Sequence, residues 1–202
     1  PRLEDLRYAM KKVNWPEGDS FKKYDGDHFP SYLSDEKKRA LKQRYRSIPE
    51  EFYTQTGLGV ITPSNFVEWM KHARSVNLKA DFQEGCSGSA RLTLTVLLAG
   101  FQIIFPIDYR YGWDINNYEH RSMLTKARLT TECTVSFYSP DCKDWTEMSN
   151  QREPWQRESL RAEQRPGLLW LHEENRSQQL EGRVYVNENP VRSAIWHESP
   201  LM

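Results

Sequence analysis

The stretch that decides the fold is "KADFQEGCSGSARLTLTVLLAGFQIIFPID", residues 79–108. Residues 79–85, "KADFQEG", are predicted as a strand, and a turn of small residues follows. A helix is predicted over 90–100, because apolar side chains recur at helical spacing and a glycine ends the pattern. A second strand is predicted over 101–108, kept short by Pro106, which has no N–H to donate within a sheet. The stretch therefore predicts a β-α-β unit.

The chain continues this alternation after the unit. Helices are predicted over 117–129 and over 154–165 with 168–180, and strands over 133–140 and 182–190. Strands that alternate with helices are typical of a mostly parallel sheet with helices on both faces. The sequence thus predicts an α/β, Rossmann-like fold.

A capped helix is predicted just before this unit, over 62–75. Thr62 is expected as its N-cap and Pro63 as its first helical residue, where the missing N–H of proline does no harm. Its buried face is expected to consist of Phe66, Met70 and Ala73. We place the start of the α/β domain, residues 61–202, at this helix.

Residues 1–60 read as an N-terminal helical and irregular extension. Short helices are predicted over 3–13 and 34–46, the second capped by Ser34 or Asp35. The segment between them is rich in glycine, proline, aspartate and aromatic residues, which indicates a loop or an arm.

Charge limits the choice of partners. The 202 residues carry 28 basic and 28 acidic side chains, so the net charge is zero and the chain has no strongly basic footprint. One run, "KKRALKQRYR" at 37–46, holds six basic residues in ten. It is either the solvated face of a helix or a surface that contacts phosphates, with Tyr45 available for stacking.

Three cysteines, Cys86, Cys133 and Cys142, are an odd number at irregular spacing. They match neither a disulfide framework nor a zinc pattern, so we expect no metal and a reducing, intracellular setting, either nucleus or cytoplasm. No apolar stretch approaches the roughly 20 residues needed to span a bilayer, so no membrane partner is expected.

The turn at 85–91 carries the first sign of a ligand. A small-residue turn before a helix lets a ligand approach the backbone and presents free N–H groups. Gly88 is followed twenty residues later by Asp108, at the end of the second strand. A carboxylate there can accept hydrogen bonds from both hydroxyls of a ribose. The turn is not GxGxxG, so a nucleoside-type cofactor is expected rather than a dinucleotide.

Further short motifs follow in a fixed order. After "CSGSA" (86–90) and Asp108 come "GWDI" (112–115), "SPDC" (139–142) and "NENP" (187–190). In order and spacing, residues 78–192 resemble cytosine-C5 methyltransferases. The resemblance implies a Rossmann-like methyltransferase domain that binds S-adenosylmethionine and acts on cytosine in DNA or RNA, so a nucleic-acid partner is expected.

The resemblance assigns roles in cofactor binding, catalysis and substrate binding to individual residues. It implies that Asp108 binds the ribose and that Asp114 contacts the adenine amino group. The remaining cofactor residues, at the glycine loop, are Cys86, Ser87, Gly88 and Ala90. For catalysis it implies Cys142 as the thiolate that adds to C6 of cytosine, and Glu188 as the group that holds a proton against N3. The target base must leave its stack to reach them, and the expected substrate-binding residues are Trp145, Ser149 and Asn189.

The chain departs from the family at several positions. Cys86 replaces the loop phenylalanine, Ala90 replaces the second loop glycine, and Asp141 separates Pro140 from Cys142. The later family elements, namely the arginine-bearing strand, the target-recognition region and the closing helix, have no counterpart after residue 190. The resemblance therefore implies a fragment completed by a missing segment or another chain, or a fold in which residues 1–60 replace part of what is lost.

Other interpretations stay open. Cys142 can be a small buried side chain, and the neighbouring Asp141 is expected to raise the pKa of its thiol, which opposes activation. Glu188 and Asn189 before Pro190 can form a simple turn. A catalytically degenerate domain that binds nucleic acid or protein is the main alternative. A third is a methyltransferase acting on an exocyclic amine, since "SPDC" is a distant variant of the Asp-Pro-Pro-Tyr type of turn.

Overall fold

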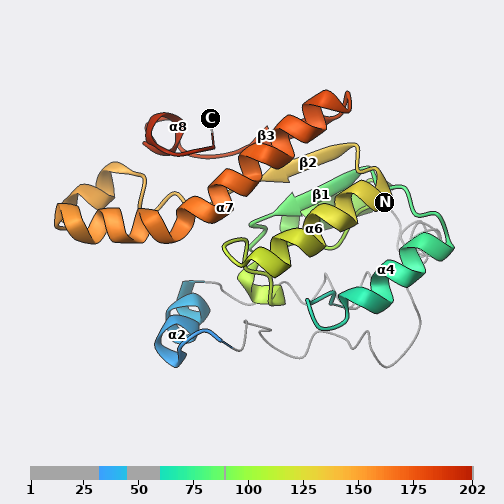
Figure 1. The fold of residues 1–202 in the computed structure, drawn as a ribbon, viewed down its shortest axis with the longest axis horizontal. Coiled ribbons are helices and arrows are strands. Elements are labelled where there is room, and N and C mark those ends of the chain that lie inside the picture. The colour runs from blue at the N-terminus through green and yellow to red at the C-terminus, as the bar shows by residue number, and fades with distance from the viewer. Residues whose placement is uncertain (1–31, 45–59, 89, 202) are drawn as a thin grey trace.

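The computed structural model describes residues 32–44, 60–88 and 90–201 (Figure 1). The predicted helix over 3–13 and the loop that follows it lie outside the described residues. The predicted domain boundary between residues 60 and 61 adjoins residues 45–59, which are outside the described ranges, so it stays a prediction.

A parallel sheet forms the centre of the fold. It contains β1 (Phe82–Gly85), β2 (Val135–Tyr138) and β3 (Val184–Asn187), in the order β1-β2-β3. All three were predicted as strands from the sequence, and the structure confirms them with shorter bounds. Because the strands are parallel, their carboxyl ends meet at one edge of the sheet.

The strand predicted over 101–108 is reduced to two isolated bridges. Ile103 pairs with Phe82 and Ile107 with Gly85, on the side of β1 opposite to β2. The Ile104 N–H donates to Phe82 O (2.9 Å). In a regular parallel ladder the next N–H donor would be two residues later, at Pro106. Proline has no N–H, so Ile107 donates to Glu84 O instead (2.9 Å). The prediction of a strand was wrong in this respect, although the segment still lies beside β1.

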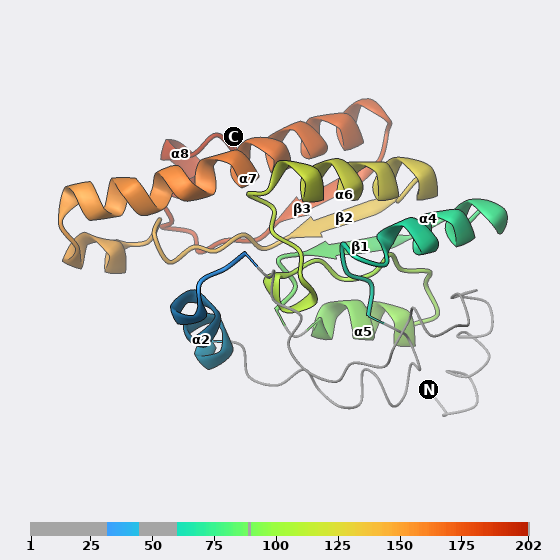
Figure 2. The same cartoon turned by 60° about the horizontal axis from the view of Figure 1, so that its bottom comes forward.

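Helices cover both faces of the sheet, as predicted. Figure 2 shows α5 on one side, with α4, α6 and α7 on the other. The helices are α2 (Asp35–Arg44), α4 (Phe66–Ser75), α5 (Arg91–Leu98), α6 (Tyr118–Thr131), α7 (Pro154–Leu180) and the short α8 (Ile195–Glu198). The structure is therefore mixed α/β, with a small parallel sheet that is compatible with a Rossmann-like arrangement.

The start of α4 differs from the prediction. Thr62 does not cap the helix, because its hydroxyl lies 2.7 Å from that of Ser64 and its N–H donates to Asn65 Oδ1 (2.8 Å). Residues 63–65 form a turn, and Asn65 stands at the N-cap position. The predicted apolar face is confirmed, since Phe66, Met70 and Ala73 are all buried, together with Trp69.

The predicted helix near residue 34 is confirmed as α2. Ser34 Oγ accepts a hydrogen bond from the Lys37 N–H (3.2 Å), and the Lys38 N–H donates to Ser34 O (2.9 Å). Of the two predicted caps, Ser34 is therefore the one used.

The two helical patterns at 154–165 and 168–180 form a single helix, α7, with Pro166 inside it. The N–H of Gly167 donates to the side chain of Asn116 (3.0 Å), next to the donor that proline lacks. A Cβ at Gly167 would meet Asn116 Oδ1 at 2.7 Å, so the backbone of α7 lies directly on residues 115–116. This contact places the first half of α7 beside the carboxyl ends of the strands.

An aromatic cluster packs α4 against residues 105–113. The ring of Phe105 lies edge-on to Trp69 (4.8 Å between centroids) and stacks on Trp113 (5.3 Å). The Trp113 indole N–H donates to Ile61 O (2.8 Å). Because Trp113 is held by packing and by this bond, the residue that follows it, Asp114, has a fixed position.

Within the described part of the chain, no helix combines the length and the apolar character needed to cross a membrane.

Candidate functional site

A pocket of about 630 Å³ opens at the carboxyl ends of the strands. Segments that follow β1, the bridged segment 103–107, β2 and β3 all contribute to its wall, and α7 and Lys37 of α2 complete it. The bridged segment and β2 flank β1 on opposite sides, so the chain reverses direction across the sheet at this point. In open α/β sheets ligands bind at such switch points.

The turn after β1 is tied to Asp108. The Gly88 N–H donates to Asp108 Oδ2 (2.9 Å), and the Arg110 N–H donates to Asp108 Oδ1 (3.1 Å). Gly88 has a φ of 54°, in the left-handed region that glycine adopts without cost. Ala90 has the same φ of 54°, so the backbone keeps the conformation that a glycine would favour although a methyl group is present. The structure thus places this turn beside Asp108.

A buried carboxylate that the sequence analysis missed anchors the start of α5. Glu84 Oε2 accepts hydrogen bonds from the Thr93 N–H (2.7 Å) and from the Thr93 hydroxyl. Burial raises the pKa of Glu84, while the two bonds from Thr93 oppose that shift. A carboxylate two residues before the glycine turn, with a threonine in the first turn of the next helix, is the signal that sequence reading could have used.

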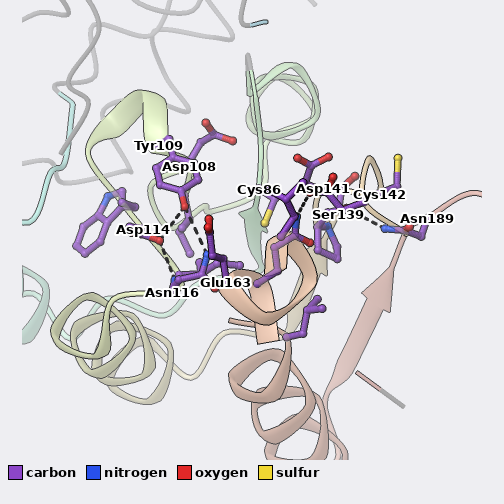
Figure 3. Close-up of a pocket in the computed structure, with 18 of the residues that line it drawn as sticks. Cys86, Asp108, Tyr109, Asp114, Asn116, Ser139, Asp141, Cys142, Glu163 and Asn189 are labelled. Carbon is purple, nitrogen blue, oxygen red and sulfur yellow. Dashed lines mark hydrogen bonds between the residues drawn. The ribbon is translucent and has the colours of Figure 1, made fainter. Parts of the chain in front are cut away.

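The carboxylate of Asp114 accepts three hydrogen bonds. Its Oδ1 accepts from the Tyr109 hydroxyl (3.0 Å) and from the Asn116 N–H (2.8 Å), and its Oδ2 accepts from the Tyr32 hydroxyl (2.8 Å). Figure 3 shows Tyr109, Asp114 and Asn116 grouped on one side of the pocket. The backbone N–H of Asp114 donates to His120 Nδ1 (3.0 Å).

His120 makes folding sensitive to acid. Burial lowers the pKa of His120, against smaller opposing effects of Asp114 and Glu119. The folded state thus binds a proton less readily than the unfolded state. Stability is therefore expected to be full above pH 6.5 and to be lost as the pH falls toward the lower folded-state pKa.

Urea unfolding at several pH values between 7.5 and 5 checks this expectation. His120→Gln keeps a hydrogen-bond acceptor but cannot take up a proton, so it should flatten the acid limb of the stability curve. The exposed His197→Gln is the matched control and should leave that limb unchanged. An acid limb identical in the wild-type chain and His120→Gln would contradict the role of His120.

The other half of the pocket holds Cys142, Glu188 and Asn189, which the structure brings together. Ser139 donates its hydroxyl proton to Glu188 Oε2 (2.6 Å), and Asn189 Nδ2 donates to Pro140 O (2.8 Å). These two bonds join the turns after β2 and β3. Figure 3 shows the sulfur of Cys142 directed away from Asp108 and Asp114.

Trp145 and Ser149 do not lie where a base-binding role would place them. Trp145 is 1% exposed, donates its indole N–H to Gln164 Oε1 (2.7 Å), and has the Arg161 guanidinium 4.7 Å above its ring. Ser149 is also buried and donates to Thr146 O (2.6 Å). Neither residue lines the pocket. The prediction failed for Trp145 because Gln164 and Arg161 of the following helix, α7, contact its indole and hold it in the core.

Of the predicted site residues, six line the pocket: Cys86, Asp108, Asp114, Cys142, Glu188 and Asn189. Ser87, Gly88 and Ala90 lie in the turn after β1 and do not line the pocket. The sequence analysis missed Tyr109 and Ser139, which stand next to predicted residues at strand ends and were within reach of the same rule. It also missed Glu163 and Gln164, whose places depend on how α7 crosses the strand ends.

The charged residues of the pocket are mainly acidic. Among the described residues that line it, Lys37 is basic and six are acidic: Asp108, Asp114, Asp141, Asp144, Glu163 and Glu188. No group of three or more histidine, cysteine or acidic side chains in the described ranges is arranged to hold a metal ion. Such a lining favours a ligand that carries positive charge and amino or hydroxyl donors, and disfavours a polyphosphate.

Comparison of the chain with protein-family models, with curated proteins and with solved structures gives no match.

Proposed function

We propose that this chain is an S-adenosylmethionine-dependent methyltransferase domain that transfers a methyl group to C5 of cytosine in DNA or RNA. The observation that carries the proposal is one pocket, at the switch point of a parallel sheet, that joins four residues named from the sequence. Asp108 and Asp114 line one side, and Cys142 and Glu188 line the other.

The residues of the pocket fit the chemistry of this cofactor. S-adenosylmethionine carries a positive sulfonium and an ammonium group, and the charged residues of the lining are mainly acidic. Ribose hydroxyls suit the carboxylate of Asp108, and the adenine amino group suits that of Asp114. Ile107, Ile115 and Leu168 supply an apolar wall for the adenine ring. A volume of about 630 Å³ lies within the roughly 300–1,000 Å³ of small-molecule sites.

The side chains on the opposite wall supply the groups that cytosine activation needs. Addition of the Cys142 thiolate to C6 makes C5 nucleophilic, and Glu188 holds a proton at N3 as negative charge develops there. Ser139 fixes the Glu188 carboxylate through a 2.6 Å hydrogen bond. The bound cofactor supplies the methyl group. Loss of the C5 proton to a water molecule then allows the thiolate to leave C6.

One observation favours the second candidate, a methyltransferase-like domain that binds without chemistry. Cys142 points away from the proposed cofactor residues in Figure 3, so its side chain must rotate before it can reach a base. The direct neighbour, Asp141, also adds a negative charge beside the thiol. A domain of this kind would bind the cofactor and nucleic acid and transfer nothing.

The proposal is tested by incubating the chain with methyl-labelled S-adenosylmethionine and cytosine-containing single strands of DNA and RNA. Transfer of the label to C5, mapped by mass spectrometry of the released nucleosides, supports it. Label on the exocyclic amine instead identifies the amine-methylating class. Cofactor binding without transfer to either strand leaves the binding module as the function.

A further inference from the structure

A segment of the N-terminal region lies against the proposed cofactor site. Residues 32–37, here called the strap, contain Tyr32, the buried Leu33 and the first turn of α2. The Tyr32 hydroxyl donates to Asp114 Oδ2 (2.8 Å). At the other end, Lys37 lines the pocket and its Nζ lies 4.0 Å from Glu163 Oε2 on α7. The strap is thus attached on both sides of the pocket.

The two oxygens of Asp114 have different partners. Oδ1 accepts from Tyr109 and Asn116, which are close to Asp114 in the chain and belong to the wall of the pocket itself. Oδ2 accepts from Tyr32, which is 82 residues away. A ligand can therefore replace Tyr32 at Oδ2 while Tyr109 and Asn116, in the wall of the pocket, keep their bonds to Oδ1.

Tyr32 keeps its proton under all ordinary conditions. Partial burial raises the pKa of Tyr32, and the hydrogen bond to Asp114 and the negative charge of that carboxylate raise it further. The phenol consequently remains a donor to Asp114. Asp114 Oδ1 already accepts two hydrogen bonds, so an amino group of a ligand would reach this carboxylate at Oδ2, where the Tyr32 hydroxyl already lies.

We propose that the strap closes the pocket and that Tyr32 holds the acceptor that Asp114 offers to an amino group of the ligand, so binding displaces Tyr32. The proposal rests on the proposed function in one respect, the use of Asp114 by the adenine amino group. The Lys37–Glu163 pair is too exposed to hold the strap by itself, with side-chain exposures of 48% and 61%. Of the two polar contacts of the strap, the one made by Tyr32 is therefore the stronger.

The first test is calorimetric titration with S-adenosylhomocysteine of the wild-type chain and of Tyr32→Phe. The variant lacks the hydroxyl that donates to Asp114, so the ligand no longer has to displace it. Because Tyr32 is half exposed, the gain is expected to be small, and binding should tighten by about three- to tenfold. Tyr118→Phe is the matched control, because Tyr118 is 76% exposed, and it should bind as the wild type does. Unchanged or weaker binding by Tyr32→Phe overturns the proposal.

Hydrogen exchange of the ligand-free chain gives an independent readout. Tyr32→Phe should speed the exchange of the α2 amides, beginning with that of Lys38, which donates to Ser34 O (2.9 Å), and the control should not. If no variant binds S-adenosylhomocysteine, the cofactor proposal fails and exchange alone decides whether Tyr32 holds the strap. Equal exchange in wild type and Tyr32→Phe would show that it does not.

Discussion

Replacing Arg128 by alanine is expected to lower the free energy of unfolding by about 3–5 kcal/mol, because it leaves a buried carboxylate without its cation. The Arg128 side chain, on α6, is 1% exposed and its Nε donates to Glu174 on α7, whose side chain is 5% exposed. The same guanidinium donates to Gln178 Oε1 (3.0 Å) and Ser177 Oγ (2.8 Å). This network joins α6 to α7, the helix that crosses the pocket.

Guanidinium unfolding followed by circular dichroism measures the effect. Arg165→Ala is the matched control, since Arg165 pairs with Glu158 at 2.8 Å on the surface, and a loss below about 1 kcal/mol is expected there. The double variant Arg128→Met with Glu174→Leu removes both charges and should recover most of the stability. A loss below about 1 kcal/mol for Arg128→Ala would contradict a buried, paired network.

Cys142→Ala is expected to reduce methyl transfer by more than about a thousandfold while binding of S-adenosylhomocysteine is retained. The reason is that, of the two thiols among the described residues that line the pocket, Cys142 follows β2 on the side of Glu188, whereas Cys86 follows β1. The measurement is label transfer at saturating cofactor, combined with mass spectrometry of the intact chain after exposure to a strand containing 5-fluorocytosine. A covalent adduct is expected with the wild type and none with the variant.

Cys133→Ala is the control for this substitution. Cys133 is fully buried, and burial raises the pKa of its thiol to about 12, so it is not available as a nucleophile. Its replacement should leave transfer and adduct formation unchanged. Full transfer by Cys142→Ala would exclude nucleophilic addition at C6 and return Cys142 to the role of a small packed side chain.

The sequence was sufficient to predict the elements that depend on local patterns. The strands β1, β2 and β3 and the helix α6 were predicted from the alternation of strand-like and helix-like segments, and α5 from helical spacing with Gly100 as its stop. Asp108 was placed correctly beside Gly88 because both belong to one β-α-β unit, and the structure joins them by a 2.9 Å hydrogen bond.

Contacts between distant parts of the chain were not predictable in this way. Trp145 was expected at a base, yet Gln164 and Arg161 of α7 hold it in the core. Tyr32 reaches Asp114 across 82 residues, and no pattern in either segment announces the contact. The shift of the α4 start is a smaller case, in which Thr62 meets Ser64 rather than a helix amide.

The central claim is that the acidic pocket binds S-adenosylmethionine, and calorimetric titration with S-adenosylhomocysteine tests it most directly. We expect micromolar binding by the wild-type chain and at least about tenfold weaker binding by Asp108→Asn, which loses a charged hydrogen-bond acceptor. Asp81→Asn is the matched control, because Asp81 is exposed at the opposite end of β1 and accepts from the Gln102 N–H (2.8 Å). Absence of binding by a chain that circular dichroism shows to be folded, or equal affinities of the wild type and Asp108→Asn, would contradict the account.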